Sequence, residues 1–390
     1  MKTATILKSL VFIVFMSVSQ LISAQKSDTT LYLITCGPGT EIYSIYGHSA
    51  LLVRIDERDT VYNWGVFDFD APHFGWRFAQ GNLDYMLIQE RLRYFLGEYF
   101  YYKRYVLSQE INLEPDEKRI ILDLITENLK PENVKYRYDF FYDDCSTRIR
   151  DLLEKAIGSK LIYPSDYKAG TTFRDLIGEY QQFYPWLQFG IDLLVGSNAE
   201  KTAGIRDKMF LPDYLMSVLS ATSVKRDTLN KPLLNRADVL LDFAPPALKK
   251  SFFTAPLFVF SLLLVILIIL SYRLRSRVQN NIMDFSIFFV FAILSLLMIF
   301  FNFFTGHEQL RANYNILWLN PFVIVLFIAI LIGKNERLWA RIVFYLTVAF
   351  LVIHLFIPQA FNVADYPVIL IIILRTIVRG EFKWSPVKLS

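Results

Sequence analysis

Apolar residues divide the chain near residue 250. Before that point they alternate or recur at helical spacing, and after it they form long continuous runs: Phe252–Tyr272, Phe285–Phe304, Ile316–Gly333 and Leu338–Ile357. Each run is close to the roughly 20 residues that cross the hydrocarbon of a bilayer. A fifth run, Tyr366–Val378, is shorter and spans only if the bilayer thins or flanking residues help. Residues 251–390 are therefore predicted to form an all-α transmembrane bundle of about five helices.

Basic residues follow alternate apolar runs, which predicts the orientation of the bundle. They come after the first, third and fifth runs: Arg273, Arg275 and Arg277; Lys334, Arg337 and Arg341; Arg375, Arg379, Lys383 and Lys388. Basic loops stay on the cytoplasmic side, and Arg375 is predicted to snorkel toward that side. Lys249 and Lys250 count against this orientation. The residues before 251 are then expected on the outer side of the membrane.

The first residues have the pattern of a secretory signal. Lys2 and Lys8 supply positive charge, Leu10–Met16 is an apolar core, and Ser23 and Ala24 are the small residues that end such a segment. Residues 1–24 are therefore predicted to be a signal peptide, with an uncleaved anchor as the alternative. In both cases residues 26–250 form an extracytoplasmic domain.

The exported part has the mixed pattern of an α+β domain. Apolar alternation and flanking turn residues predict five strands: Leu31–Thr35, Gly47–Ile55, Val61–Phe69, Tyr105–Leu113 and Lys135–Phe140. Met86–Phe100 is predicted to be helical. A second helix is predicted to begin at Pro115, because proline suits the first turn of a helix.

A third helix is predicted to begin near Cys145. Asp143 or Asp144 is a suitable N-cap, and Gly158 is placed to end the helix. The apolar residues after the cysteine fall on one face at helical spacing: Ile149, Leu152, Leu153, Ala156 and Ile157. Cys145 lies one turn before Ile149, so we expect its side chain to point toward the sheet that this face covers.

A thiol at a helix N-terminus is suited to act as a nucleophile, because the helix dipole favours the thiolate. Such a thiol needs a base, and His48 is the best candidate because it lies in an otherwise apolar strand. Asn63, on the next strand, is expected to orient its ring, with Asp68 and Asp70 in reserve. Asp143 and Asp144 oppose ionisation of the thiol.

Other interpretations of these residues remain open. Cys145 could be an inert buried thiol, or it could form a disulfide with Cys36 in an oxidising compartment. His48 could be a buried histidine whose ring is satisfied by a structural hydrogen bond. The spacing of residues alone does not decide among these.

Composition excludes several classes of function. The net charge is +4, and no basic stripe points to a nucleic-acid partner. Neither cysteine lies in a CxxC pair and the histidines are scattered, so no metal site is predicted. No phosphate-binding or dinucleotide-binding glycine motif is present, and no cofactor is predicted.

Several motifs carry a resemblance to one family. They are Tyr46–Leu51, Tyr62–Phe69, Asp144–Arg148, Thr172–Arg174, Pro185–Trp186, Phe210–Asp213, and His307 with Asn313–Pro321. Together they resemble Lnb-type bacterial lipoprotein N-acyltransferases over about residues 28 to 330. The order of histidine before cysteine is similar to circularly permuted papain-like enzymes such as lecithin retinol acyltransferase. Position 144 departs from the family pattern, since we expect Asn there and find Asp.

The resemblance implies a function and a location. A fatty acyl chain would move from a membrane phospholipid to Cys145 as a thioester, and then to the α-amine of a diacylglyceryl-cysteine lipoprotein, with His48 as base and Asn63 as third residue. It also implies that Tyr46, Arg148, His307 and Asn315 contact substrate. The protein would be a multi-pass protein of the bacterial inner membrane, with its catalytic domain on the periplasmic side.

Two alternatives are kept. The first is a papain-like amidase or peptidase of the cell wall, which would use the same Cys145 and His48 with water as acceptor. The second is a non-enzymatic envelope scaffold with a Cys36–Cys145 disulfide. A wall hydrolase has no need of a membrane bundle, which favours the acyltransferase.

Overall fold

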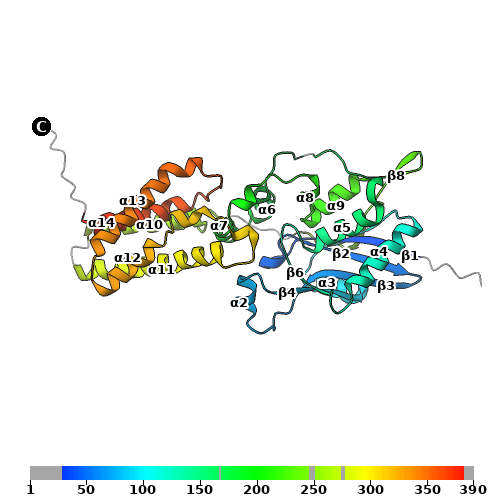
Figure 1. Cartoon of the computed structure of the whole chain (residues 1–390), viewed down its shortest axis with the longest axis horizontal. Coiled ribbons are helices and arrows are strands. Elements are labelled where there is room, and N and C mark those ends of the chain that lie inside the picture. Colours follow the sequence, from blue (N-terminus) through cyan, green and yellow to red (C-terminus); the bar gives the residue numbers. More distant parts are fainter. Residues whose placement is uncertain (1–28, 167, 246–250, 274–276, 382–390) are drawn as a thin grey trace, which may run out of the picture.

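The computed structural model describes residues 29–166, 168–245, 251–273 and 277–381. The predicted signal peptide lies outside the described residues. So do five of the basic residues used for orientation: Lys249, Lys250, Arg275, Lys383 and Lys388. Figure 1 shows two parts, a sheet-containing domain and a set of long helices beside it.

Seven antiparallel strands form the main sheet, in the order β10-β5-β1-β2-β3-β4-β6. Their bounds are β1 Thr29–Cys36, β2 His48–Ile55, β3 Arg58–Val66, β4 Asp84–Arg91, β5 Val106–Glu110, β6 Lys135–Arg137 and β10 Asp238–Leu241. A small second sheet consists of β7 Leu161–Ile162, β8 Ser223–Arg226 and β9 Leu229–Pro232. The predicted mixture of strands and helices is confirmed.

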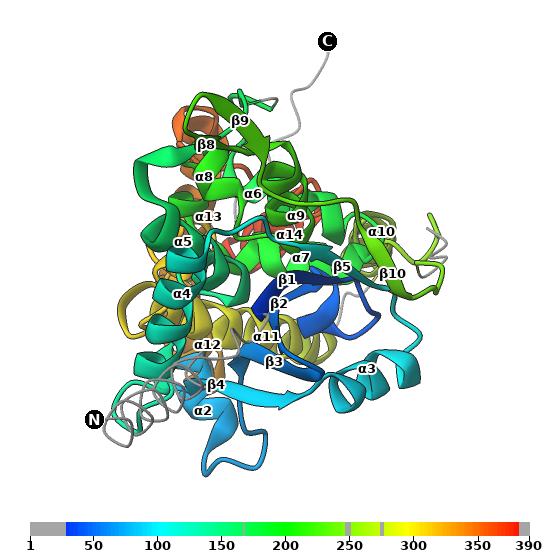
Figure 2. The same ribbon diagram turned by 90° about the vertical axis from the view of Figure 1, so that its right-hand side faces the viewer.

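Helices cover both faces of the main sheet (Figure 2). On one face lie α4 (Pro115–Asn128), α5 (Cys145–Ile157) and α9 (Pro212–Ala221), whose apolar residues share a core with Leu31, Leu33, Leu51 and Val53. On the other face α3 (Leu92–Tyr101) packs on Ile34, Ala50 and Leu52. Successive residues of β1 and β2 thus alternate between two cores, as strand geometry requires.

The other short helices of this domain lie between these strands and helices along the chain. They are η1 Ile42–Ser44, α2 Phe74–Ala79, η2 Gly158–Lys160, α6 Phe173–Gln181, α7 Pro185–Leu194, η3 Ser197–Glu200 and α8 Ile205–Lys208. A third core joins α6 to the loops around Phe141 and Phe210.

Several sequence-based boundaries are wrong. The strands predicted at Tyr105–Leu113 and Lys135–Phe140 are shorter, at Val106–Glu110 and Lys135–Arg137. Two other differences matter more. Met86–Phe100 is not one helix, because residues up to Arg91 form strand β4 and α3 begins at Leu92. The buried alternation of Tyr85 and Leu87 pairs this segment with β3 and the edge strand β6, and that pairing overrides its helical propensity. Strand β3 ends at Val66 rather than Phe69, after a register shift between Asn63 and Val66.

The described residues of the membrane part form five main helices: α10 Pro256–Arg273, α11 Arg277–Phe303, α12 Phe322–Ile332, α13 Glu336–Ile353 and α14 Asp365–Gly380. Among the described residues, three segments are long and apolar enough to cross a membrane: Pro256–Arg273, Gln279–Phe303 and Glu336–Phe356. A fourth is added if Glu308–Leu317 and Phe322–Ile332, which meet at 56°, form one bent span. Two short helices, η4 Glu308–Leu310 and η5 Tyr314–Leu317, lie in the loop before α12, and η6 His354–Phe356 follows α13.

Arg375 does not snorkel, contrary to the prediction. Its side chain is fully buried between helices, where its guanidinium pairs with Asp284 of α11 at 2.7 Å. Ser271 of α10 accepts a second hydrogen bond from it at 2.6 Å. A buried charge is retained when it has such partners, so Arg375 joins α10, α11 and α14.

The loop between α11 and α12 attaches the two parts to each other. Asn313, almost fully buried, donates from Nδ2 to the carbonyls of Leu193 and Leu194 in α7 at 2.8 and 2.9 Å. Trp76 of α2 lies against Phe300 of α11, with ring centroids 5.2 Å apart. A Cβ on Gly196 would lie 2.0 Å from the carbonyl oxygen of Arg311, so this contact requires glycine.

Candidate active site

Cys145 is the first residue of α5, as predicted. Asp144 is the N-cap: its Oδ1 accepts a hydrogen bond from the backbone N–H of Thr147 at 2.8 Å, and its own N–H donates to the Thr147 hydroxyl at 2.7 Å. This reciprocal cap fixes the start of the helix. The thiol is 6% exposed and faces the sheet within the same core as Leu51.

The Cys145 thiol is influenced by the Ser146 hydroxyl, 3.9 Å from the sulfur, and by the backbone N–H groups of Ser49, Ser146 and Cys145 itself. Each lowers the pKa of the thiol, but burial has the larger effect and the pKa is raised overall. The expectation of a thiolate favoured by the helix terminus is therefore not met in the resting site. The Ser146 hydroxyl donates to the Ser49 hydroxyl at 3.0 Å and joins α5 to β2.

The thiol lies where β3 diverges from β2. The paired register of these strands runs from Ile55↔Arg58 to Leu51↔Tyr62. Beyond it Gly65 adopts a φ of +88°, which favours glycine. A Cβ on Gly65 would lie 3.9 Å from the Cβ of Cys145 and 3.6 Å from the Tyr138 ring.

His48 begins β2 and is held by Asn63, as predicted. Its Nε2 lies 2.7 Å from Asn63 Oδ1. Because Oδ1 can only accept, Nε2 carries the hydrogen and Nδ1 is the unprotonated nitrogen. Burial lowers the pKa of His48, with the Asn63 bond opposing the shift and the charge of Arg104 adding to it. A neutral ring of this tautomer is suited to act as a base.

The Cys145 thiol lies near Ser49 of β2, and His48 is the residue before Ser49. Strand alternation assigns the Ser49 side chain to the α5 face and His48 to the face of Ala50, while the sulfur meets the backbone N–H of Ser49 at the divergence of the strands. No hydrogen bond joins the Cys145 sulfur to the His48 ring in the part of the chain described. Their pairing in catalysis stays a prediction.

Glu90 extends the His48–Asn63 pair. Asn63 Nδ2 donates to Glu90 Oε1 at 3.4 Å, and burial raises the pKa of that carboxyl. The predicted helix over 86–100 concealed this contact, because strand pairing is what puts Glu90 beside Asn63. The reserve residues Asp68 and Asp70 lie in the loop after β3, where the backbone N–H of Asp70 donates to Asp68 Oδ1 at 2.8 Å. Neither is hydrogen-bonded to His48 among the described residues.

The two cysteines are free and buried, so the predicted alternative of a disulfide is not formed. Cys36 belongs to the core on the α3 face, and burial raises its pKa to about 12. The scaffold alternative therefore lacks the disulfide on which it depended.

The four predicted substrate residues lie in separate surroundings. The Tyr46 hydroxyl accepts from Gln181 Nε2 at 2.7 Å. Arg148 pairs with Asp143 through two bonds of 2.5 and 2.7 Å, and its guanidinium lies 3.7 Å from the centre of the Tyr136 ring. His307 Nε2 donates to the Phe78 carbonyl at 2.7 Å. Asn315 is fully buried and donates to the Leu193 carbonyl at 3.0 Å.

Comparison with known families agrees with this arrangement. Residues 20–178 match the Lnb N-terminal periplasmic domain, and residues 248–382 match the Lnb transmembrane domain. The chain belongs to the Lnb family. This membership makes it a membrane protein with a periplasmic domain and is consistent with an acyltransferase. No curated protein and no solved structure matches the chain.

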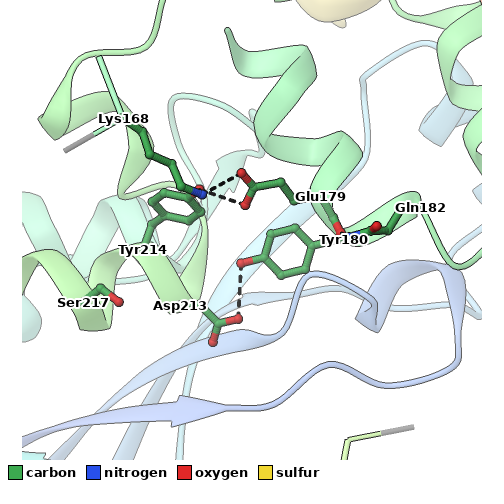
Figure 3. A pocket seen from close by; sticks show the side chains of 7 residues that line it. All are labelled: Lys168, Glu179, Tyr180, Gln182, Asp213, Tyr214 and Ser217. Atoms are coloured by element: carbon green, nitrogen blue, oxygen red, sulfur yellow. Dashed lines mark hydrogen bonds and ion pairs between the residues drawn. The ribbon is translucent and has the colours of Figure 1, made fainter. Parts of the chain in front are cut away.

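A polar cavity of about 450 Å³ opens between α6 and α9 of this Lnb-type protein (Figure 3). Its polar groups are paired with one another: Lys168 with Glu179 at 2.7 Å, and Tyr180 with Asp213 at 3.2 Å. Cys145 and His48 do not line it. Because these groups bond to one another, we assign no ligand to this cavity.

A second cavity of similar size lies where the Lnb periplasmic domain meets the membrane part. It is lined by Asn198, Lys201, Asn302, Phe303, Glu308, Arg311 and Ala312. The predicted substrate residue His307 directly precedes Glu308 in this lining. The cavity therefore lies beside one of the residues that the resemblance assigns to substrate.

Proposed function

We propose that this Lnb-type protein transfers a fatty acyl chain from a membrane phospholipid to the α-amine of a diacylglyceryl-cysteine lipoprotein, through a thioester on Cys145. The observation that carries the proposal is the setting of Cys145, whose buried thiol begins α5 and faces the sheet near Ser49, the residue that follows His48 on β2. Family membership supports lipoprotein N-acylation as the outcome. The periplasmic domain is proposed to be papain-like with the histidine before the cysteine, joined to five membrane spans.

In the first step His48 Nδ1 would take the proton of the Cys145 thiol while the sulfur attacks the ester carbonyl of the phospholipid. This requires the ring and the thiol, which strand alternation assigns to different faces of β2, to meet at the start of that strand. The new bond is S–C, and the ester C–O bond breaks. The leaving lysophospholipid oxygen takes the proton from His48. The raised pKa of the thiol and the lowered pKa of the imidazole leave both groups neutral before the reaction, so the proton moves during attack.

In the second step the amine of the lipoprotein attacks the thioester. A C–N bond forms, the C–S bond breaks, and His48 carries the amine proton to the departing sulfur. The product amide is more stable than the ester consumed, so no further energy source is needed. Tyr46, Arg148, His307 and Asn315 are proposed to contact one of the two substrates.

The function is tested on purified full-length protein in detergent. Incubation with phospholipid should add the mass of one acyl group to Cys145, and a diacylated lipopeptide with a free amine should then remove it as an amide. Cys145→Ala should abolish the adduct and Cys36→Ala, the other buried thiol, should retain it. Release of free fatty acid or peptide cleavage in place of the amide would favour the hydrolase alternative, and an adduct that persists in Cys145→Ala would refute the assignment.

A further inference from the structure

Tyr136 on β6 has a buried hydroxyl with no hydrogen-bond partner among the described residues. A buried phenol without a partner costs free energy, since its bond to water is lost and nothing replaces it. A group of this kind calls for an explanation, and a role in catalysis is one. The location of the hydroxyl points to that role.

The hydroxyl lies beside the nucleophile. A Cβ on Gly65 would lie 3.9 Å from the Tyr136 hydroxyl and 3.9 Å from the Cβ of Cys145. The two groups therefore flank the same space, which the missing side chain of Gly65 leaves open. Negative charge at Cys145 also raises the pKa of Tyr136, in keeping with this proximity.

Arg148 favours a donor role for this phenol. Its guanidinium lies 3.7 Å from the centre of the Tyr136 ring and is fixed from behind by Asp143. A cation on the ring face stabilises negative charge near the hydroxyl. Burial, the largest effect, nevertheless holds the pKa of Tyr136 well above its ordinary value of 10.0, so the hydroxyl keeps its proton at working pH.

We propose that the Tyr136 hydroxyl is a catalytic hydrogen-bond donor to the oxyanion that forms when an acyl carbonyl is attacked at Cys145. This inference rests on the proposed function and adds a residue to it. In the resting enzyme the hydroxyl has no partner in the described part of the chain. In the tetrahedral intermediate it donates to the negative oxygen, together with the backbone N–H groups at the start of α5, so its bond forms when charge develops.

The test is Tyr136→Phe, which removes one oxygen atom. With phospholipid as donor, single-turnover acylation of Cys145, followed by intact mass, should slow by about a hundredfold to a thousandfold, the usual loss for one oxyanion donor. The melting temperature should stay the same or rise, because the lost hydroxyl had no partner. Acylation of Tyr136→Phe at the wild-type rate would overturn the proposal.

Alkylation of Cys145 by iodoacetamide separates this role from a structural one. That reaction displaces iodide at a saturated carbon and develops no oxyanion, so Tyr136→Phe should be alkylated at the wild-type rate. Slowing of alkylation and acylation by the same factor would mean that Tyr136 acts on the thiol, and would also overturn the proposal. Wild-type protein that is alkylated but never acylated would instead defeat the proposed function.

Tyr163→Phe is the matched control. The Tyr163 hydroxyl donates to Glu154 near the far end of α5 at 2.8 Å, so its loss breaks a formed bond away from the thiol. It should lower the melting temperature and leave acylation unchanged, the reverse of the result expected for Tyr136→Phe.

Discussion

Asn63 holds the ring of His48 by a hydrogen bond of 2.7 Å between Oδ1 and Nε2. This bond sets the tautomer and leaves Nδ1 as the basic nitrogen. Asn63→Ala should therefore slow acylation of Cys145 by about tenfold to a hundredfold, because a freed ring samples other orientations and small misplacements have such costs. Rates are measured by intact mass with phospholipid as donor.

Asn128→Ala is the control for that substitution. Trp64, the next residue along β3, donates from its ring nitrogen to Asn128 Oδ1 at 2.8 Å. Asn128→Ala removes a comparable hydrogen bond, from a ring N–H to a side-chain amide oxygen, on the other face of β3. If it slows acylation as much as Asn63→Ala, the effect of Asn63 is a general loss of stability.

The resting thiol should react slowly at neutral pH. Burial raises the pKa of Cys145 and lowers that of His48, so the two neutral groups are favoured over a thiolate–imidazolium pair. Iodoacetamide should alkylate Cys145 more slowly than a small free thiol, with the rate still rising above pH 9.0, the ordinary value for the group. A rate that is already maximal at neutral pH would contradict this state.

Asp144→Asn should stabilise the protein. Burial raises the pKa of Asp144 well above its ordinary value of 3.8, so ionising this carboxyl costs stability, and the cost grows as the pH rises above 3.8 toward the folded-state value. Asparagine keeps the cap to Thr147 without a charge. The melting temperature of Asp144→Asn should exceed that of the wild type at neutral pH, and the difference should shrink in acid.

Asp144→Ala separates the cap from the charge. It removes both, and loss of an N-cap costs about 1 kcal/mol. Its stability should fall below that of Asp144→Asn at every pH. Equal stabilities of the two variants would mean that the side-chain bond to Thr147 contributes nothing.

Asn313→Ala should weaken the attachment between the two parts of the chain. The substitution leaves two buried carbonyls of α7 without this donor, at a cost of about 1–3 kcal/mol. Thermal unfolding in detergent should occur at lower temperature. Asn112→Ala is the control, because it also removes a hydrogen bond from a side-chain amide to a backbone carbonyl, but at an exposed site of the periplasmic domain. It should lower the unfolding temperature less. Equal losses would argue against a special role for Asn313.

The sequence determined the features that depend on neighbouring residues. Continuous apolar runs predicted the membrane helices, and the cap, stripe and glycine around Cys145 predicted the start and end of α5. These signals are local, because helix caps and hydrocarbon thickness act on segments of fixed length. The contact between His48 and Asn63 could also be predicted, because the apolar pattern indicates that both residues lie on neighbouring strands.

Only the tertiary structure decided which distant groups meet. Glu90 lies beside Asn63 because β3 pairs with β4. The Tyr136 hydroxyl and Cys145 both lie beside Gly65 because β6 adds to the edge of the sheet next to β4. The protonation of Cys145 was also decided there: the helix terminus predicted a thiolate, and burial reversed the balance. Burial and strand pairing depend on the whole packed chain, and no window of sequence contains them.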